Sequence, residues 1–398
     1  MVSARGDHVC IVVQNLPVPF DRRVWLECQA LRDAGYTVSV VCPKGPGDPA
    51  FQELDGVALH KYRAFPPITR KIMFVAEYLW SVLATFVVLT RVWRRAPFSV
   101  VQVCNPPDVL WIAVLPFRLR GVRMVYDQHD LCPELYLSRF GGSTGLPYRA
   151  LQVAERITYA LAAQVISTNE SYRRVAMTRG RKRPADVTVV RTGPDPDRMR
   201  RVDEDEELRR GHPFLLVYLG VMGPQDGVDH ALRAMHEIVH VHGRTDVALT
   251  LIGDGDAGAD LRRLAEDLAL GDHVHFTGRA PDALVATLLS TADVGLSPDP
   301  RNPLNDVSTM NKTMEYMAFE LPVVAYDLVE TRVSAADAAI YAEPNRVDSY
   351  ALAILDLLAD EVRRKEMGVA GRRRVEDVLA WRNQIPPYVH VYDRLSGR

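Results

Sequence analysis

The sequence of 398 residues predicts an α/β protein with two doubly wound, Rossmann-like domains. Short apolar runs rich in β-branched residues alternate with longer helix-like stretches, which is typical of parallel sheets with helical crossovers. The alternation restarts after a proline-rich, charged segment at 194–213. We therefore expect a first domain at 1–193, a linker at 194–213, a second domain at 214–375, and a segment at 376–398 that crosses back to the first domain.

The expected strands are placed by their hydrophobic runs and by the turn residues beside them. The chain opens with a β-α-β unit, in which the run at 8–14 is followed by a helix that ends at Gly35. The stretch 376–395 is helix-like and is interrupted at Pro386 and Pro387. The other strands are expected at 37–43, 100–103, 124–127, 164–167, 187–191, 214–219, 247–252, 273–277, 294–298 and 322–325.

Composition and charge exclude several classes of protein. Apolar residues make up 47% and charged residues 25% of the chain, as in an ordinary globular enzyme. The formal net charge of −2 gives no general attraction to nucleic acid, so we expect no nucleic-acid partner. The five cysteines form no Cys-x-x-Cys pair, and the first ten residues contain no long apolar run of a signal peptide. These features indicate buried thiols in a cytoplasmic protein.

One apolar segment leaves two interpretations open. Residues 72–95 are largely apolar, but Glu77 interrupts the run and its length barely reaches that of a membrane-spanning helix. Basic residues on both flanks, together with Trp80 and Trp93, favour a helix on an anionic membrane surface. The protein would then be peripheral on the inner face of the membrane. A helix packed on the sheet of an α/β domain explains the same residues.

Two stretches of the second half have the chemistry of an anion site. After the strand at 214–219, a loop with Gly220, Gly223 and Gly227 leads into a helix, whose first amides can bind a diphosphate. Such glycines also occur in α/β proteins that bind no phosphate. GDGD at 253–256 is interpreted as a structural turn, and we expect no required metal.

The stretch STMNKTMEYMA places a cation at the start of a predicted helix. Ser308, Thr309 or Asn311 can cap this helix. Lys312 in its first turn opposes the helix dipole unless an anion such as a diphosphate lies there. Glu315 follows on the same side, and its carboxylate can accept hydrogen bonds from both hydroxyls of a sugar diol. A Lys–Glu pair on the helix surface is the alternative interpretation.

The order and spacing of several stretches resemble glycosyltransferase family 4, whose members have the GT-B fold of two Rossmann-like domains facing across a cleft. These stretches cover nearly the whole chain and include DQHDLCPELYLSRFG, YLGVMGPQDGVD, LTLIGDGD, HVHFTGRAP and NKTMEYMAFELPVVAYDLVETR. The subgroup that they resemble comprises bacterial enzymes of capsule, exopolysaccharide or O-antigen assembly. The resemblance implies a retaining glycosyltransferase. Its donor would be a nucleoside diphosphate sugar, expected as a UDP-linked hexose or N-acetylhexosamine. Its hydroxyl acceptor would be a saccharide, such as one linked to polyprenyl diphosphate.

The resemblance also implies roles for single residues. Glu315 matches a glutamate that accepts hydrogen bonds from the ribose of the nucleotide, and Lys312 would stabilise the leaving diphosphate. Arg279 lies in the segment that lines the nucleobase pocket. Arg191 matches a position near the interdomain hinge from which it could reach a phosphate, and an ordinary surface arginine is the alternative.

His129 is the residue of the first half with an implied catalytic role. It follows the strand at 124–127, and strand ends are where α/β sheets place their chemistry. The family has a histidine here, and a neutral imidazole could bond a hydroxyl of the donor sugar. A structural histidine bonded to Asp127 or Asp130 is the alternative.

Two positions depart from the family pattern and keep other functions open. Asp226 stands where many members carry a lysine, so one phosphate cation is missing. Val307 replaces the first glutamate of the Glu-x7-Glu motif, and either the adjacent Asp306 or the backbone amides of 307–310 would take its place. The alternatives are a nucleotide-sugar epimerase of the same fold and a non-catalytic relative of the glycosyltransferases.

Overall fold

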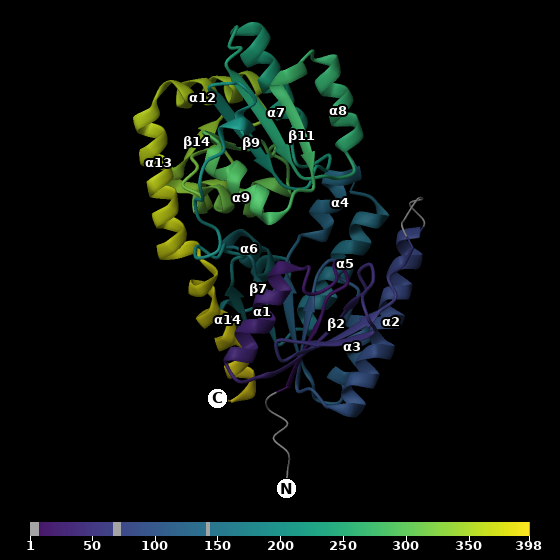
Figure 1. Cartoon of the computed structure of the whole chain (residues 1–398). Coiled ribbons are helices and arrows are strands. Elements are labelled where there is room, and N and C mark those ends of the chain that lie inside the picture. The colour runs from purple at the N-terminus through teal and green to yellow at the C-terminus, as the bar shows by residue number, and fades with distance from the viewer. Residues whose placement is uncertain (1–7, 67–72, 141–143, 398) are drawn as a thin grey trace. The chain divides into compact units, whose positions relative to one another are not determined.

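The structure, a computed structural model, describes residues 8–66, 73–140 and 144–397. It consists of two compact units, each built on its own β-sheet (Figure 1). The first unit runs to Arg191 and takes in the C-terminal segment from Gln384 onward. The second unit runs from Thr192 to Asn383 and includes Ser138–Phe140. Two α/β units with parallel sheets confirm the predicted fold class.

The first sheet has eight strands in the order β3-β4-β2-β1-β5-β6-β7-β8, and only β3 and β4 pair antiparallel. Every residue of β1 and β5 is buried, because helices cover both faces of the sheet and its central strands have no contact with water. The strands are β1 (His8–Val12), β2 (Thr37–Pro43), β3 (Phe51–Leu54), β4 (Val57–Tyr62), β5 (Val100–Cys104), β6 (Arg123–Gln128), β7 (Gln164–Ser167) and β8 (Val187–Val189).

Seven helices of the described chain accompany this sheet. They are α1 (Arg22–Asp33), α2 (Met73–Arg95), α3 (Trp111–Arg118), α4 (Cys132–Phe140), α5 (Leu146–Leu161), α6 (Glu170–Thr178) and α14 (Trp381–Ser396). The carboxylate of Asp21 caps α1 by accepting a hydrogen bond from the amide of Val24 at 3.1 Å. All five cysteines lie buried and unpaired in this unit, as predicted for thiols: Cys10, Cys28, Cys42, Cys104 and Cys132.

The structure contains a hairpin of β3 and β4 that was not among the predicted strands. Its turn consists of Asp55 and Gly56, with φ angles of 48° and 76°. An Asp-Gly pair is a strong signal for such a two-residue turn, so the sequence contained the information. Parallel pairing of β4 with β2, in which Val40 lies opposite Leu59, joins the hairpin to the sheet.

The second sheet has six parallel strands in the order β11-β10-β9-β12-β13-β14. Its strands are β9 (Phe214–Leu219), β10 (Val247–Ile252), β11 (Val274–Gly278), β12 (Val294–Ser297), β13 (Val323–Tyr326) and β14 (Ala339–Ala342), of which β14 was not predicted. Its helices are α7 (Val228–His236), α8 (Gly258–Asp267), α9 (Asp282–Thr291), α10 (Asn311–Ala318), α11 (Val329–Ala335), α12 (Val347–Ala359) and α13 (Glu361–Arg374).

The segment 194–213, expected as a linker, belongs to the second unit and is bonded to it. The amide of Val202 donates to Ser290 at the end of α9, at 3.0 Å. Arg209 forms an ion pair of 2.6 Å with Asp293. Hydrogen bonds and ion pairs therefore attach this segment to the second unit although it has almost no apolar residues.

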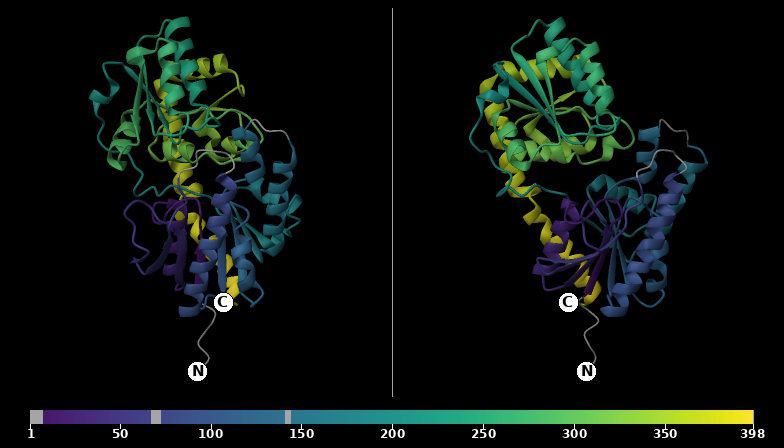
Figure 2. Two further views of the ribbon diagram at one scale, coloured as in Figure 1. Left: turned by 90° about the vertical axis from the view of Figure 1, so that its right-hand side faces the viewer. Right: turned by 45° about the vertical axis from the view of Figure 1, so that its right-hand side comes forward.

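The helix α14 continues through Pro386 and Pro387, so the predicted interruption at these prolines is wrong. Each proline removes one backbone hydrogen bond. The helix nevertheless persists because Tyr388 and Tyr392 are fully buried in the first unit. Figure 2 shows α14, in yellow, running beside the first sheet in both views.

The helix α2 packs one face on the first unit and exposes the other. Ser81, Thr85 and Leu89 are buried, whereas Leu79 and Leu83 are 68% and 58% exposed. Among the described residues, no helix combines the length and the apolar character that crossing a bilayer requires.

Candidate active site

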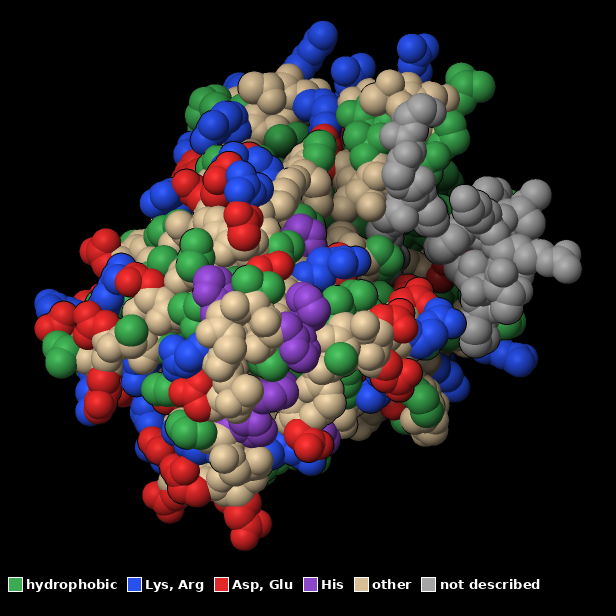
Figure 3. Space-filling view, turned by 90° about the horizontal axis from the view of Figure 1, so that it is seen from above, with side chains coloured by type: hydrophobic (Ala, Val, Ile, Leu, Met, Phe, Trp, Pro, Cys, Tyr) green, Lys and Arg blue, Asp and Glu red, His purple; other side chains and the backbone are tan. Residues whose placement is uncertain are grey.

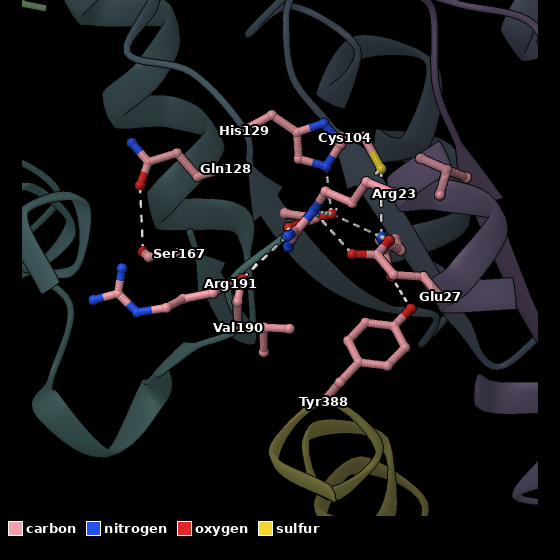
Figure 4. A network of polar contacts seen from close by, with 12 residues as sticks. Arg23, Glu27, Cys104, Gln128, His129, Ser167, Val190, Arg191 and Tyr388 are labelled. Carbon is pink, nitrogen blue, oxygen red and sulfur yellow. Dashed lines mark hydrogen bonds and ion pairs between the residues drawn. The ribbon is translucent and has the colours of Figure 1, made fainter. Parts of the chain in front are cut away.

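A buried cluster of polar side chains surrounds Asp127, near the C-terminal end of β6 (Figure 4). Arg23 on α1 donates to Oδ1 of Asp127 at 2.8 Å and pairs with Glu27 one turn later at 3.0 Å. All three side chains are nearly inaccessible, with 6%, 0% and 0% exposed for Arg23, Glu27 and Asp127. One guanidinium thus faces two carboxylates in a medium where unpaired charges are costly.

The pKa values of the two carboxyls move in opposite directions. Burial alone would raise the pKa of Asp127, but the charge of Arg23 and the interaction with His129 outweigh it and lower the pKa. Burial, together with the charge of Asp127, raises the pKa of Glu27 well above its ordinary value. Asp127 is therefore the ionised member of the pair and the natural partner of Arg23.

His129 lies two residues beyond Asp127, and its Nε2 lies 2.6 Å from Oδ2 of that aspartate. An ionised carboxylate can only accept, so Nε2 carries a proton. In the neutral ring, Nδ1 is then the acceptor, and it lies on the side of the ring away from Asp127 (Figure 4). The amide of His129 donates to Asn105 Oδ1 at 2.7 Å, which fixes the backbone as well. The alternative interpretation, a structural histidine bonded to Asp127 or Asp130, predicted this hydrogen bond to Asp127. The bond uses Nε2 and leaves Nδ1 available to a ligand.

Four side chains of this cluster could in principle share a metal ion: Glu27, Cys104, Asp127 and His129. However, the guanidinium of Arg23 pairs with both carboxyls, and Asp127 is the ionised one, so the charge of this pair is already balanced. A divalent metal would have to compete with this buried cation, and the residues do not fit one. That the protein requires no metal remains a prediction.

Lys312 on α10 is the centre of the candidate site in the second unit. Its Nζ lies 2.5 Å from Oδ1 of Asp299, and the two side chains are 10% and 2% exposed. Burial would lower the pKa of Lys312, but the charges of Asp299 and Asp226 raise it, so the lysine is a cation. Its partner is therefore Asp299, which the sequence analysis missed, and not Glu315 of the same helix. The position of Asp299, just beyond β12, is a signal that could have identified it.

The predicted glycine loop lies beside this lysine. A Cβ added at Gly220, whose φ is 150°, would lie 3.5 Å from Cε of Lys312. Asp226 accepts a hydrogen bond from the amide of Gly223 at 2.8 Å, which closes the loop. A Cβ at Gly227 would lie 2.1 Å from the carbonyl oxygen of Pro298, so only glycine fits there. The structure thus places Gly220, Lys312 and Asp299 together.

The start of α10 differs from the prediction. The helix begins at Asn311, its N-cap is Met310, and no side chain caps it, so the expected capping by Ser308, Thr309 or Asn311 is wrong. Ser308 instead donates to the carbonyl of Leu304 at 2.8 Å. The amides of the first turn therefore lack the side-chain acceptor that most helix ends have.

The other predicted site residues lie on both units. Glu315 is half-buried on α10, and Arg279 is exposed just after β11. Arg191 follows β8, and its guanidinium points away from the cluster around Asp127 (Figure 4). Asp306, the candidate substitute for the missing glutamate, accepts from the amide of Val329 at 3.2 Å.

Histidine side chains gather on the face of the second unit seen in Figure 3. A surface hollow of the second unit is lined by residues that include Arg210, His212, His273 and His275. Another hollow is lined by residues that include Arg332. Neither hollow contains a residue predicted for the donor site, so we do not assign them to it.

A second buried ion cluster joins α4, α5 and α6 in the first unit. Arg179 binds both oxygens of Glu134 at 2.6 and 3.0 Å, so this glutamate has a structural partner. The same guanidinium pairs with Glu155 at 2.5 Å, and Glu155 is fully buried. Burial raises the pKa of Glu155 to about 7 although Arg179 opposes the shift.

This shift predicts a pH dependence of stability. The folded pKa of Glu155 lies above that of an unfolded glutamate, about 4.3, so the folded state binds the proton more tightly. Its contribution to stability is present at low pH and is lost as the pH rises through 7. Between pH 5 and pH 8 we expect the natural protein to lose about 2–3 kcal/mol more unfolding free energy than Glu155→Gln. Urea unfolding at both pH values measures this, and equal losses in the two proteins would contradict it.

Comparisons with known proteins agree with this fold and extend it. A family model described as "Glycosyltransferase Family 4" matches residues 21–198, and one described as "Glycosyl transferases group 1" matches residues 213–360. The fold and the two matches define a glycosyltransferase scaffold of the GT-B class. The chain belongs to glycosyltransferase family 4.

Individual relatives are similar over part or all of the chain. The "GDP-mannose-dependent alpha-(1-6)-phosphatidylinositol monomannoside mannosyltransferase" of Mycolicibacterium smegmatis is 32% identical over 54% of this chain and 56% of its own length. The first three curated relatives are matched over 56%, 66% and 41% of their lengths. Among solved structures, sucrose-phosphate synthase of Thermosynechococcus elongatus has a TM-score of 0.81 at 18% identity, covering 98% of this chain and 99% of its own. The Anabaena protein Alr3699/HepE in complex with UDP and glucose has a TM-score of 0.72 at 15% identity, covering 98% of this chain and 100% of its own.

Proposed function

We propose that the protein is a retaining glycosyltransferase that moves a sugar from a nucleoside diphosphate donor to a hydroxyl acceptor. The observation that carries the proposal is the buried cation Lys312, held by Asp299 beside the glycine at 220 and at the uncapped start of α10. A chain of family 4 with this arrangement has the components that a leaving diphosphate needs.

The chemical role of these groups follows from where charge develops. As the sugar leaves, negative charge accumulates on the diphosphate, and fixed amides and a fixed cation stabilise it without rearrangement. The amides come from the starts of α10 and α7 and the cation from Lys312. Asp299 holds the lysine in place, and Glu315 is proposed to bind the ribose, with Asn311, Gly223, Arg191 and Arg279 as further donor contacts.

The first unit contributes His129 in this proposal. Its Nδ1 acceptor, kept by the bond from Nε2 to Asp127, would receive a hydrogen bond from a hydroxyl of the donor sugar. We assign no protein nucleophile. The leaving phosphate would accept the proton of the acceptor hydroxyl, as expected for front-face displacement.

Two nucleobases, uracil and guanine, are candidates for the base of the donor. UDP is the expectation from the sequence, and the similar Alr3699/HepE structure holds UDP and glucose. The mannosyltransferase that is 32% identical is named as GDP-mannose-dependent, which favours GDP-mannose. Both candidates place the same diphosphate beside Lys312.

The experiment that tests the proposal is a thermal-stability screen with UDP, GDP, UDP-glucose, UDP-N-acetylglucosamine and GDP-mannose. Binding to the folded state raises the melting temperature, and ligand at about 100 times its Kd adds about 2.7 kcal/mol of stability. We expect one base to stabilise the protein, and transfer to be seen with its sugar. If no nucleotide stabilises the protein, the proposal fails.

Two further assays separate the alternatives. Complete turnover of a nucleotide sugar without acceptor would indicate an epimerase. Tight donor binding without transfer to any acceptor would indicate a non-catalytic relative, which the unusual Asp226 and Val307 would then explain.

We also propose that the acceptor is a lipid-linked saccharide, reached at a membrane surface. The outer face of α2 exposes five apolar side chains: Leu79, Trp80, Leu83, Phe86 and Val87. The exposed arginines Arg91, Arg94 and Arg95 follow on the same helix. An apolar face with an adjacent basic end is typical of helices at anionic membrane surfaces.

Vesicle sedimentation tests this surface. With vesicles containing phosphatidylglycerol, the double change Leu79→Gln/Leu83→Gln is expected to weaken binding by about tenfold or more, because two leucines no longer enter the lipid. The control Leu352→Gln/Val362→Gln alters side chains that are 54% and 67% exposed in the second unit and should bind as the natural protein does. If all three proteins bound the vesicles equally, α2 would not be the membrane-binding surface.

A further inference from the structure

Gln102 is the polar residue in the centre of the buried strand β5, and it is fully inaccessible. Its Nε2 donates to Glu27 at 2.7 Å and to Oδ2 of Asp127 at 3.1 Å. Its Oε1 accepts from the hydroxyl of Tyr388 at 2.8 Å and from that of Tyr392. Every hydrogen-bonding position of this amide therefore has a partner.

These partners determine the orientation of the amide. Asp127 is ionised and can only accept, and the tyrosine hydroxyls donate here, so the NH2 group must face Asp127 and the oxygen must face the tyrosines. A flipped amide would direct its carbonyl at two acids and its NH2 group at two donors. Gln102 is thus held in one orientation from two sides.

The same aspartate oxygen links Gln102 to the candidate active site. Oδ2 of Asp127 accepts from Gln102 and also lies 2.6 Å from Nε2 of His129. Three successive hydrogen bonds therefore lead from α14 through Gln102 and Asp127 to the imidazole. Figure 4 shows Tyr388 reaching from α14 toward this cluster.

We propose that Gln102 is a positioning residue through which Tyr388 and Tyr392 of α14 fix the ring orientation and the Nε2–H tautomer of His129. The inference deepens the proposed function and rests on it for its kinetic consequences. Gln102 does not touch the substrate; it fixes the oxygen against which the imidazole is aligned. The C-terminal helix, distant in sequence from β6, is then part of the positioning of the site.

Two variants test the coupling from opposite ends. Gln102→Leu keeps a side chain of similar size and removes both sets of hydrogen bonds. Tyr388→Phe/Tyr392→Phe removes only the two hydroxyls. The matched control is Tyr36→Phe. The hydroxyl of Tyr36 also binds α14, because it donates to Asp393 Oδ1 at 2.7 Å, but it is not one of the partners of Gln102.

The readouts are the histidine 15N spectrum and steady-state kinetics with the donor found in the nucleotide screen. In the natural protein we expect His129 to show a single Nε2–H tautomer. In the two test variants we expect a mixture of tautomers and a kcat lower by roughly 10- to 100-fold, because small misplacements of a reacting group are costly. The donor KM should change by less than about twofold, since binding of the nucleotide is not affected. Tyr36→Phe should match the natural protein in both measurements.

An unchanged tautomer and an unchanged kcat in the test variants would overturn the inference, and so would an equal loss in Tyr36→Phe. Should Gln102→Leu not yield folded protein, the double tyrosine variant decides alone. If the natural protein transfers no sugar but the tautomer of His129 still depends on Gln102, the proposed function fails and the link from α14 through Gln102 to His129 stands. If transfer occurs and the tautomer and kcat are insensitive to these residues, the coupling fails and the function stands.

Discussion

Replacing Lys312 with methionine is expected to raise the donor KM and to lower kcat/KM by roughly 10²–10³-fold, the usual cost of removing one group that stabilises developing charge. Methionine keeps an apolar stem over the ring of Tyr218, from which Nζ of the lysine lies 5.2 Å. The loss is therefore electrostatic. Initial rates over a range of donor concentrations measure it, and unchanged kinetics would remove Lys312 from the diphosphate site.

Stability must be separated from catalysis in this variant. Lys312→Met leaves Asp299 with 2% of its side chain exposed and no buried cation beside it, and breaking such a pair costs about 3–5 kcal/mol. The double variant Asp299→Asn/Lys312→Met removes both charges and should recover most of that stability. It should not recover transfer. If transfer returned together with stability, Lys312 would be structural only.

Replacing His129 with alanine is expected to lower kcat by roughly 10²–10³-fold, because a fixed hydrogen-bonding partner of the sugar is lost. Nucleotide binding should change little, since Lys312 and the glycine loop, the main diphosphate contacts that we propose, are in the second unit. The test measures kcat, and the melting temperature with and without nucleotide, for His129→Ala and for the natural protein. A large loss of nucleotide affinity would show that the role assigned to His129 is wrong.

The fold should tolerate this change. After removal of the imidazole, Oδ2 of Asp127 still accepts from Gln102, and Oδ1 is still paired with Arg23. The variant Arg23→Met is the contrasting control, since it leaves Asp127 buried without its cation and should unfold more readily. Similar melting temperatures of these two variants would contradict this description of the cluster.

Local patterns were sufficient to predict most of the strands and to single out the lysine that we propose for the donor site. Continuous apolar runs such as 247–252 must be buried on both faces, so they predict central parallel strands. Lys312 stood out because a cation in the first turn opposes the helix dipole. Asp299 did not stand out, because an aspartate between two prolines is typical of a turn and its pairing depends on a residue 13 positions away.

The cluster around Asp127 could be predicted only in part. His129 was identifiable from its place after a strand, but Arg23 and Glu27 were not, because charged residues in a helix usually face water. Gln102 could have been noticed as the polar residue in an apolar strand. Its partners Tyr388 and Tyr392 lie 286 and 290 residues away, and no local pattern connects them.

By itself the sequence determined the alternation of strands and helices and the residue types available for chemistry, because both depend on hydrophobic periodicity and side-chain identity over short distances. The tertiary structure decided which charges meet. It paired Lys312 with Asp299, placed Arg23 between two buried acids, and kept α14 helical through two prolines by burying its tyrosines. The physical reason is that burial makes the energy of a charge or a hydrogen bond depend on its nearest partner, and here those partners come from distant parts of the chain.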